Sequence, residues 1–193
     1  MTRVLVVFAH PCEESLSSAL KAVVTERLAA RGWEVDLCDL YAEGFDPVLT
    51  AAERRGYQDI STNTAPVQGH VDRLRAAQAL VLVHPVWNFG LPAILKGYID
   101  RVFLPGVSFT LEKGLVAPGL THIRKLAVVT SYGATPFRAF AAGNPPKRFY
   151  TRALRFVCRP DRLRYLALYD MNRATDGQRK AFLARVGREM DRL

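Results

Sequence analysis

Residues 79–92 read ALVLVHPVWNFGLP, and this stretch decides the fold class. Its first part, Ala79 to Val83, is a short unbroken apolar run, which is typical of a parallel strand covered on both faces. A Pro/Asn/Gly loop follows, and from Pro92 apolar residues recur at helical spacing up to Val102. Ligands of open α/β sheets bind where such loops leave the carboxyl edge of the sheet. This loop is therefore the first candidate binding site.

The rest of the chain repeats the alternation of strand and helix. Apolar or alternating runs predict four further strands, and amphipathic stripes predict helices at both ends of the chain. The strands are expected over 4–8, 33–38, 125–130 and 163–169. The terminal helices are expected over 15–31 and from Thr175 onward, where Thr175 with Gln178 resembles a capping box. Residues 46–68 are polar and irregular, and we expect them to form a surface excursion that contains short helical segments. Together the elements predict an α/β three-layer sandwich, with a five-stranded parallel sheet, helices on both faces, and a single domain over residues 1–193.

Composition narrows the class of protein. Hydrophobic residues make up 49% of the 193 residues, enough for one good core. The longest apolar run, Val4 to Ala9, is far too short to span a membrane, and no basic region with a cleavage site precedes it, so we expect a cytoplasmic protein without membrane insertion. The three cysteines are widely separated, and His70 and His122 lack partners at ligand spacing. We therefore expect neither a disulfide framework nor a metal site.

Charge is concentrated in the C-terminal third. The net charge is +9, and residues 124–193 hold 16 Lys and Arg against 5 Asp and Glu, whereas residues 1–123 hold 11 against 13. The densest cluster of these basic residues would attract the phosphates of a dinucleotide, which predicts a preference for NADPH over NADH. A solvated basic face is the alternative. The cluster comprises Lys147, Arg148, Arg152, Arg155, Arg159, Arg162 and Arg164. No helix-turn-helix, zinc-finger or RNA-recognition pattern accompanies it, so we expect no nucleic-acid partner.

The loop after the first strand is the second candidate site. Residues 10–18 read HPCEESLSS and place hydroxyl groups and free amides at a helix N-terminus, which favours an anion such as phosphate. An ordinary N-cap by Ser15 or Ser17 is the alternative. Glu13 and Glu14 would repel a phosphate and are assigned to solvent. The chain contains neither Gly-x-Gly-x-x-Gly nor a P-loop, which weighs against a classical dinucleotide fold or an ATPase.

Two motifs carry a resemblance to a known family. Residues 84–103 resemble the flavin-binding loop of the flavodoxin-like NAD(P)H:quinone oxidoreductases, the family of DT-diaphorase and the FMN-dependent azoreductases. Trp87-Asn88-Phe89 is nearer the azoreductases, and the part from Gly90 is nearer the quinone reductases. His10 and Ser15 match the family's His-x-x-x-x-Ser pattern. The alternative is an ordinary connection in which Trp87 and Phe89 cap the core.

The resemblance implies a set of flavin-binding residues. The loop after the first strand would hold the flavin phosphate, the loop after the third would lie along the isoalloxazine ring, and the loop after the fourth would border its other edge. In that order, the residues are His10, Ser15, Leu16 and Ser17; Pro85, Val86, Trp87, Asn88 and Phe89; and Thr130, Ser131, Tyr132 and Gly133. Trp87 and Tyr132 are candidate lining residues, or alternatively packed core aromatics. The Gly-Gly pair and the downstream Tyr and His of DT-diaphorase are not reproduced, so no catalytic acid or base is assigned.

The resemblance also implies an activity. NAD(P)H would reduce the flavin, and the reduced flavin would pass two electrons to a quinone or azo compound with ping-pong kinetics. FMN is the expected flavin, with FAD as the alternative, and a homodimer is the expected assembly. Two rival roles remain open: an ancillary subunit of a bacterial potassium-efflux system, in peripheral contact with its transporter, and a flavin-free interaction domain.

Overall fold

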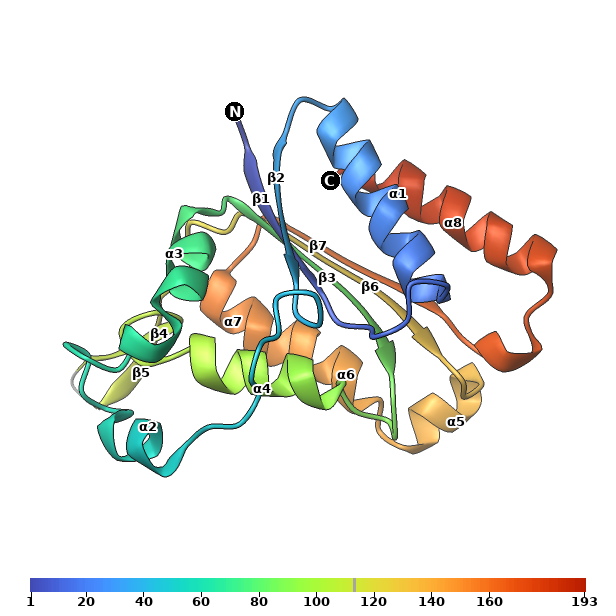
Figure 1. Ribbon diagram of the computed structural model, residues 1–193. Helices are drawn as coiled ribbons and strands as arrows, with labels where there is room; N and C mark the ends of the chain where they lie inside the picture. The colour runs from blue at the N-terminus through green and yellow to red at the C-terminus, as the bar shows by residue number, and fades with distance from the viewer. Residues whose placement is uncertain (113) are drawn as a thin grey trace.

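A parallel sheet runs through the middle of the molecule in the order β2-β1-β3-β6-β7 (Figure 1). The computed structural model describes residues 1–112 and 114–193. All four neighbouring strand pairs of this sheet are parallel, so the predicted flavodoxin-like α/β class is confirmed. The strands are β1 (Arg3–Phe8), β2 (Glu34–Asp39), β3 (Ala79–Val86), β6 (Lys125–Tyr132) and β7 (Arg162–Leu168).

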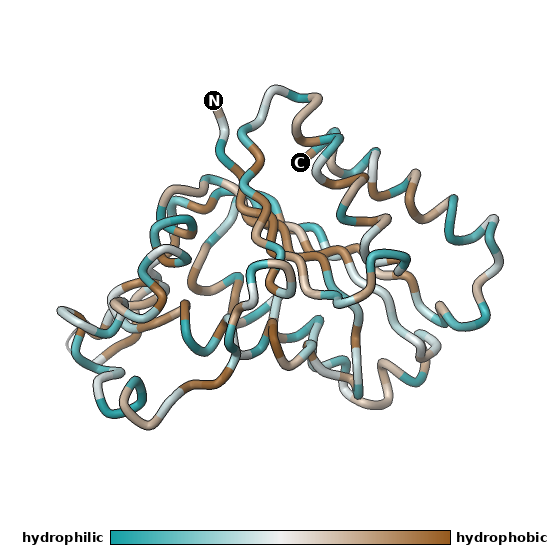
Figure 2. Tube along the Cα trace, in the orientation of Figure 1, coloured by the Kyte–Doolittle hydropathy of each residue, from teal (hydrophilic) through white to brown (hydrophobic). Residues whose placement is uncertain are grey.

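Helices cover both faces of the sheet (Figure 1). On one face α1 and α8 pack against each other and bury apolar residues such as Leu20 and Val186. On the other face lie α3, α4 and a segment running from α6 through a π-helical turn, η2, into α7. Hydrophobic residues accordingly concentrate along the central strands in Figure 2. The bounds are α1 (Leu16–Ala30), α3 (Gln68–Ala76), α4 (Ala93–Val102), α6 (Pro145–Arg148), η2 (Phe149–Leu154), α7 (Arg155–Cys158) and α8 (Asp176–Met190).

Helix ends follow local rules that the sequence displays. Ser15 caps α1 and Gly32 follows that helix with a φ of 75°, a backbone angle that glycine adopts without strain. Thr175 and Gln178 form the predicted capping box of α8. These groups satisfy amide groups that helix geometry leaves without partners, and for that reason they can be predicted from short sequence windows.

Two strands run further than expected. β3 continues to Val86 and β6 to Tyr132, so Pro85, Val86, Ser131 and Tyr132 lie in paired strand instead of in loops. Proline is tolerated there because the β1 side of β3 is unpaired beyond Val83, where β1 ends. The loops therefore begin two or three residues later than predicted.

Several short elements complete the fold, and those in the surface excursion agree with its expected short helical segments. The surface excursion contains α2 (Ala51–Gly56), which begins with its own capping box, and a 3₁₀ turn, η1 (Ala65–Val67). A β-hairpin, β4 (Phe109–Glu112) with β5 (Leu115–Pro118), follows α4, and α5 (Pro136–Ala141) follows β6. A second 3₁₀ turn, η3 (Met171–Arg173), follows β7. Within the described ranges, none of the helices combines the length and the hydropathy that crossing a lipid bilayer requires.

Candidate functional site

Loops from three adjacent strands meet at the carboxyl edge of the sheet. The His10 ring, after β1, lies 5.7 Å from the Trp87 ring, after β3. A hollow of about 390 Å³ opens between β3 and β6. Its lining brings together six predicted residues and two that were not predicted, namely Pro85, Val86, Trp87, Asn88, Ser131 and Gly133, with Met171 and Asn172.

A tight turn shapes the rim of this hollow. The Trp87 N–H donates to the Gly90 carbonyl at 3.2 Å, and the Gly90 N–H donates to the Trp87 carbonyl at 2.8 Å. Asn88 and Phe89 form the tip with φ values of 48° and 56°, the left-handed pair of a type I′ turn. Gly90, which closes the turn, does not have a positive φ. Asparagine tolerates this region better than phenylalanine does, so strain of about 1–3 kcal/mol is held beside the hollow.

The aromatic residues of the turn face solvent. Trp87 is 41% exposed and Phe89 is 38% exposed, so the alternative that they cap the core is wrong. A second hollow of about 200 Å³ adjoins the turn, lined by Val86, Asn88, Phe89, Tyr132, Gly133 and Ala134. Exposed rings beside two hollows offer a flat apolar surface to a planar ligand.

The loop after β1 forms a hydrogen-bonded cradle at the start of α1. The Ser15 Oγ accepts from the Ser18 N–H at 3.1 Å, the Ser18 Oγ donates to the Cys12 carbonyl at 3.0 Å, and the Cys12 N–H donates to His10 Nδ1 at 3.0 Å. Ser15 is therefore a genuine N-cap, as the alternative held. The amides of Leu16 and Ser17 lie in the first turn, where an α-helix supplies no internal partner, and they remain available to an anion.

The hollow beside this cradle carries mixed charge. It encloses about 220 Å³ and is lined by His10, Ser18 and Lys21 together with Glu13 and Asp39, among others. The Lys21 Nζ is 3.2 Å from Asp39 Oδ2. Glu13 and Glu14 are exposed, as predicted, although Glu13 also lines the hollow. An anion would bind more readily at the helix amides than beside the carboxylates of Glu13 and Asp39, which line the hollow.

Two predicted site residues are buried, although Tyr132 also lines the second hollow. Thr130 is fully buried, and its hydroxyl has no hydrogen-bond partner within residues 1–112 and 114–193. Tyr132 is 1% exposed, its hydroxyl donates to Asn144 Oδ1 at 2.7 Å and pairs with the Tyr165 hydroxyl, and its ring stacks on Tyr169 at 4.6 Å. Strand alternation turns both side chains toward the face that holds His84. Burial raises the pKa of Tyr132 to about 12, so its hydroxyl stays protonated at neutral pH.

His84 stiffens the strand beneath the loop. It is fully buried in β3, its Nε2 lies 2.7 Å from the Tyr150 hydroxyl, and its Nδ1 lies 2.8 Å from the Pro85 carbonyl. The carbonyl can only accept, so Nδ1 carries the proton and Nε2 accepts from Tyr150. Tyr150 belongs to the π-helical turn, which thereby holds the end of β3 in place.

The buried imidazole predicts a pH dependence of stability. Burial lowers the pKa of His84 from 6.5 to about 4, so between these values the unfolded chain binds a proton that the folded chain does not. The free energy of unfolding should therefore fall as the pH drops from 6.5 toward 4, by roughly 3 kcal/mol from this group. Urea unfolding at pH 7 and pH 5 should show a smaller difference in His84→Gln than in the unsubstituted protein. Equal differences would contradict the assignment.

Sequence reasoning missed Met171 and Asn172. Both follow β7, and Asn172 approaches Gly133 so closely that a Cβ at residue 133 would lie 3.1 Å from its Nδ2. The signal was present, because the loop after the predicted fifth strand had to emerge at the same sheet edge.

Two arginines of the basic third lie away from the hollow between β3 and β6. Arg162 and Arg164 stand at the start of β7, at the amino edge of the sheet. They cannot bind a dinucleotide at this hollow, which removes part of the basis for the NADPH preference.

Comparison with known proteins decides the family. Residues 2–190 match the family described as having a flavodoxin-like fold. The chain belongs to that family. The structure of an NAD(P)H:quinone oxidoreductase from Methanothermobacter marburgensis superposes on this fold with a TM-score of 0.86, at 26% identity and covering 98% of each chain.

Curated relatives of this flavodoxin-like chain bear related names. An uncharacterized NAD(P)H oxidoreductase of Escherichia coli is 33% identical over 108 residues, which cover 55% of each protein. NAD(P)H dehydrogenase [quinone] 1 of Rattus norvegicus is 33% identical over 124 residues, which cover 56% of this chain and 45% of the rat protein. The chain thus spans about half the length of these two relatives. The resemblance inferred from the loop motifs is confirmed.

Proposed function

We propose that this protein is a flavin-dependent NAD(P)H oxidoreductase that passes two electrons to quinone-type acceptors. The observation that carries the proposal is the hollow between β3 and β6, bordered by the strained turn and the exposed Trp87. The relatives named as NAD(P)H oxidoreductases support it. No specific observation favours the transporter-subunit alternative.

The chemistry of the lining fits a flavin. Trp87, Val86 and Met171 supply apolar surface for a planar ring system, and Asn88 and Asn172 supply amide groups for its heteroatoms. We propose that the amides of Leu16 and Ser17 hold the phosphate at the start of α1. When bound, the flavin supplies hydride transfer, and the protein supplies orientation.

The chain's own residues then have limited chemical roles. The turn at residues 87–90 positions the ring, and the exposed aromatic rings restrict the access of water. The hydroxyl of Tyr132 is committed to Asn144 and Tyr165 and remains protonated. We therefore assign no catalytic acid or base, and propose that solvent protonates the reduced acceptor.

FMN is our proposed flavin. The Trp87-Asn88-Phe89 turn resembles that of the azoreductases. An FMN-dependent NADH-azoreductase from Bacillus anthracis, with FMN bound, shares the fold at 16% identity, which extends the likeness to fold alone. Azo compounds stay proposed acceptors beside quinones.

Because the proposed donor, NAD(P)H, is a cytoplasmic metabolite, we also propose that the protein acts in the cytoplasm. We propose that it does so as one flavin-binding domain.

The first experiment is the visible absorption spectrum of the purified protein. We expect a flavin spectrum, release of FMN on heating, and parallel lines in double-reciprocal plots when NAD(P)H and a quinone are varied. FAD in the heat extract would correct the flavin assignment alone. A colourless protein that takes up neither FMN nor FAD would overturn the proposed function.

A homodimer is the assembly we propose. Phe137 and Phe140, on α5, are each 77% exposed, and α5 begins just after the β6 loop that borders the hollow. Exposed aromatic residues in such a position mark an interaction surface. Light scattering should give a dimer mass for the unsubstituted protein and a monomer mass for Phe137→Asp/Phe140→Asp. Leu115→Asp, at a position that is 74% exposed on β5, is the matched control and should stay dimeric. A monomeric mass for the unsubstituted protein would contradict the proposal.

A further inference from the structure

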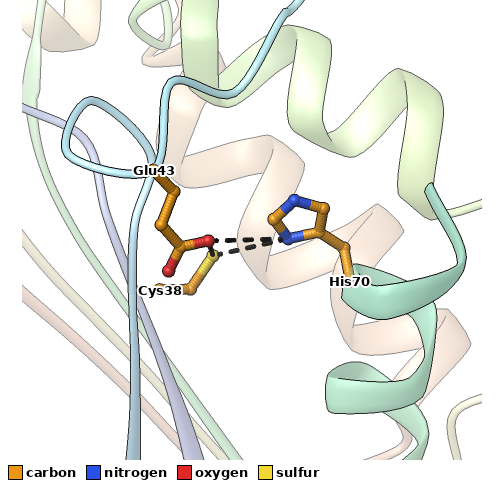
Figure 3. Close-up of side chains that lie close together, drawn as sticks. All are labelled: Cys38, Glu43 and His70. Carbon is orange, nitrogen blue, oxygen red and sulfur yellow. Dashed lines mark hydrogen bonds and ion pairs between the residues drawn. The ribbon is translucent and has the colours of Figure 1, made fainter.

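Three metal-ligating side chains from separate segments converge beside the edge strand (Figure 3). Cys38 lies near the end of β2, Glu43 lies in the following loop, and His70 lies on α3. The Cys38 Sγ is 3.7 Å from Glu43 Oε2 and 3.7 Å from His70 Nδ1, and these last two atoms are 4.0 Å apart. One sulfur, one nitrogen and one oxygen therefore form a nearly equilateral triangle.

The size of this triangle suits a small divalent cation. Around tetrahedral zinc, bond lengths of about 2.0–2.3 Å place pairs of ligand atoms about 3.3–3.8 Å apart. The two distances from the Cys38 Sγ, 3.7 Å each, lie within this range, and the 4.0 Å between His70 Nδ1 and Glu43 Oε2 lies just above it. A thiolate, an imidazole and a carboxylate together select zinc-like cations over magnesium and calcium, which prefer oxygen ligands alone.

Neighbouring rings hold His70 in place. Phe45 and Tyr98 meet the imidazole edge to face, with ring centroids 5.0 Å and 5.5 Å away. Cys38 is buried, whereas the side chains of Glu43 and His70 remain 33% and 22% exposed. The site is thus rigid on its inner side and open to solvent on its outer side, which leaves room for a water ligand.

The surrounding charges compensate a cation. The Arg73 Nη1 donates to both Glu43 oxygens, at 2.9 Å and 2.8 Å, and Arg73 also pairs with Asp36. A metal that takes Oε2 leaves Oε1 to the guanidinium, and Asp36 balances the arginine charge. Arg73 would then orient the carboxylate, as outer hydrogen bonds do at metal sites.

An unsatisfied hydroxyl lies next to the cluster. Tyr98 is 1% exposed, and its hydroxyl has no hydrogen-bond partner within the two described ranges of the chain. The Tyr98 ring packs edge to face against the imidazole of His70, with ring centroids 5.5 Å apart. Buried polar atoms without a partner are rare and call for one, which a metal-bound water would supply.

We propose that Cys38, Glu43 and His70 bind one zinc-like divalent cation, with water as the fourth ligand. The site is separate from the hollow between β3 and β6, because Cys38 lies on the outermost strand and points toward α3 and α4. The cation would fasten the loop after β2 to α3 and so stabilise the fold. Cys38 would bind as the thiolate and release its proton to solvent when the metal binds.

Calorimetric titration of the chelator-treated protein with Zn²⁺ tests this site. Matched controls are Cys158→Ser, because that thiol is as buried as Cys38, and Cys12→Ser, because that thiol is exposed. We expect stoichiometric uptake in the unsubstituted protein and in both controls. Cys38→Ser should lose uptake, and His70→Gln and Glu43→Gln should bind at least about tenfold more weakly.

A second readout keeps the test independent of enzyme activity. Cd²⁺ should give a thiolate charge-transfer band in the ultraviolet difference spectrum, and Zn²⁺ should raise the Tm of the unsubstituted protein but not that of His70→Gln. If Cys38→Ser does not fold, the variants at the two partly exposed positions, His70→Gln and Glu43→Gln, test the site. Absence of uptake, uptake unchanged in His70→Gln and Glu43→Gln, or uptake lost in Cys12→Ser would each overturn the site.

Discussion

Replacing Asn88 by valine is expected to weaken FMN binding by about 10- to 100-fold. Asn88 has a φ of 48° at the tip of the turn, and a β-branched residue is strongly disfavoured in the left-handed region. A cost of about 1–3 kcal/mol would open the hydrogen-bonded closure between Trp87 and Gly90 and displace the rim of the hollow. Titration of the flavin-free protein with FMN, followed by flavin fluorescence, measures the change.

Asn88→Gly is the matched control for the backbone. Glycine adopts a positive φ freely, so this variant keeps the turn and removes only the amide side chain. Retained affinity in Asn88→Gly would assign the effect to turn geometry, and an equal loss in both variants would assign it to the amide. Unchanged FMN affinity in Asn88→Val would contradict the role of the turn.

Replacing Gly97 by alanine should lower the free energy of unfolding by about 3 kcal/mol. A Cβ on this residue of α4 would lie 2.3 Å from the Pro47 carbonyl oxygen and 2.5 Å from Pro47 Cα. Backbone atoms cannot yield as a flexible side chain can, so either α4 or the loop that follows β2 must shift. Urea unfolding measures the loss.

Gly69→Ala provides the control in α3. An added Cβ at Gly69 meets no atom within 4 Å, so the substitution should be neutral or stabilise the helix by about 0.5–1 kcal/mol. A Gly97→Ala variant that unfolds at the same urea concentration as the unsubstituted protein would show that the contact with Pro47 relaxes without cost.

Prediction succeeded where structure depends on neighbouring residues. The apolar runs of β1, β3 and β6 and the capping box at Thr175 could be located because burial pattern and helix capping act over a few positions. The hairpin β4–β5 and the π-helical turn could not, because both are short and their stability comes from packing against the rest of the chain.

The candidate site divides in the same way. Trp87 and Asn88 were located from the loop motif and do line the hollow, whereas Thr130 and Tyr132 proved to be buried. The predicted fourth strand ended at residue 130, whereas β6 continues to Tyr132. Pairing with β3 sets the face of the sheet to which the side chains of Thr130 and Tyr132 turn. Asn172 joined the site only through the position of β7 beside β6.

By itself, the sequence determined the fold family, the five strands of the parallel sheet, the helices α1, α4 and α8, and the two loops at the carboxyl edge of the sheet. The spacing of apolar residues, the helix-capping residues and the loop motifs each depend on a few neighbouring positions, so they can be recognised in the sequence. Only the tertiary structure decided which side chains enter the hollow, the left-handed pair at Asn88 and Phe89, and the meeting of Cys38, Glu43 and His70. Those outcomes depend on strand register and on packing between distant segments, which no local pattern encodes.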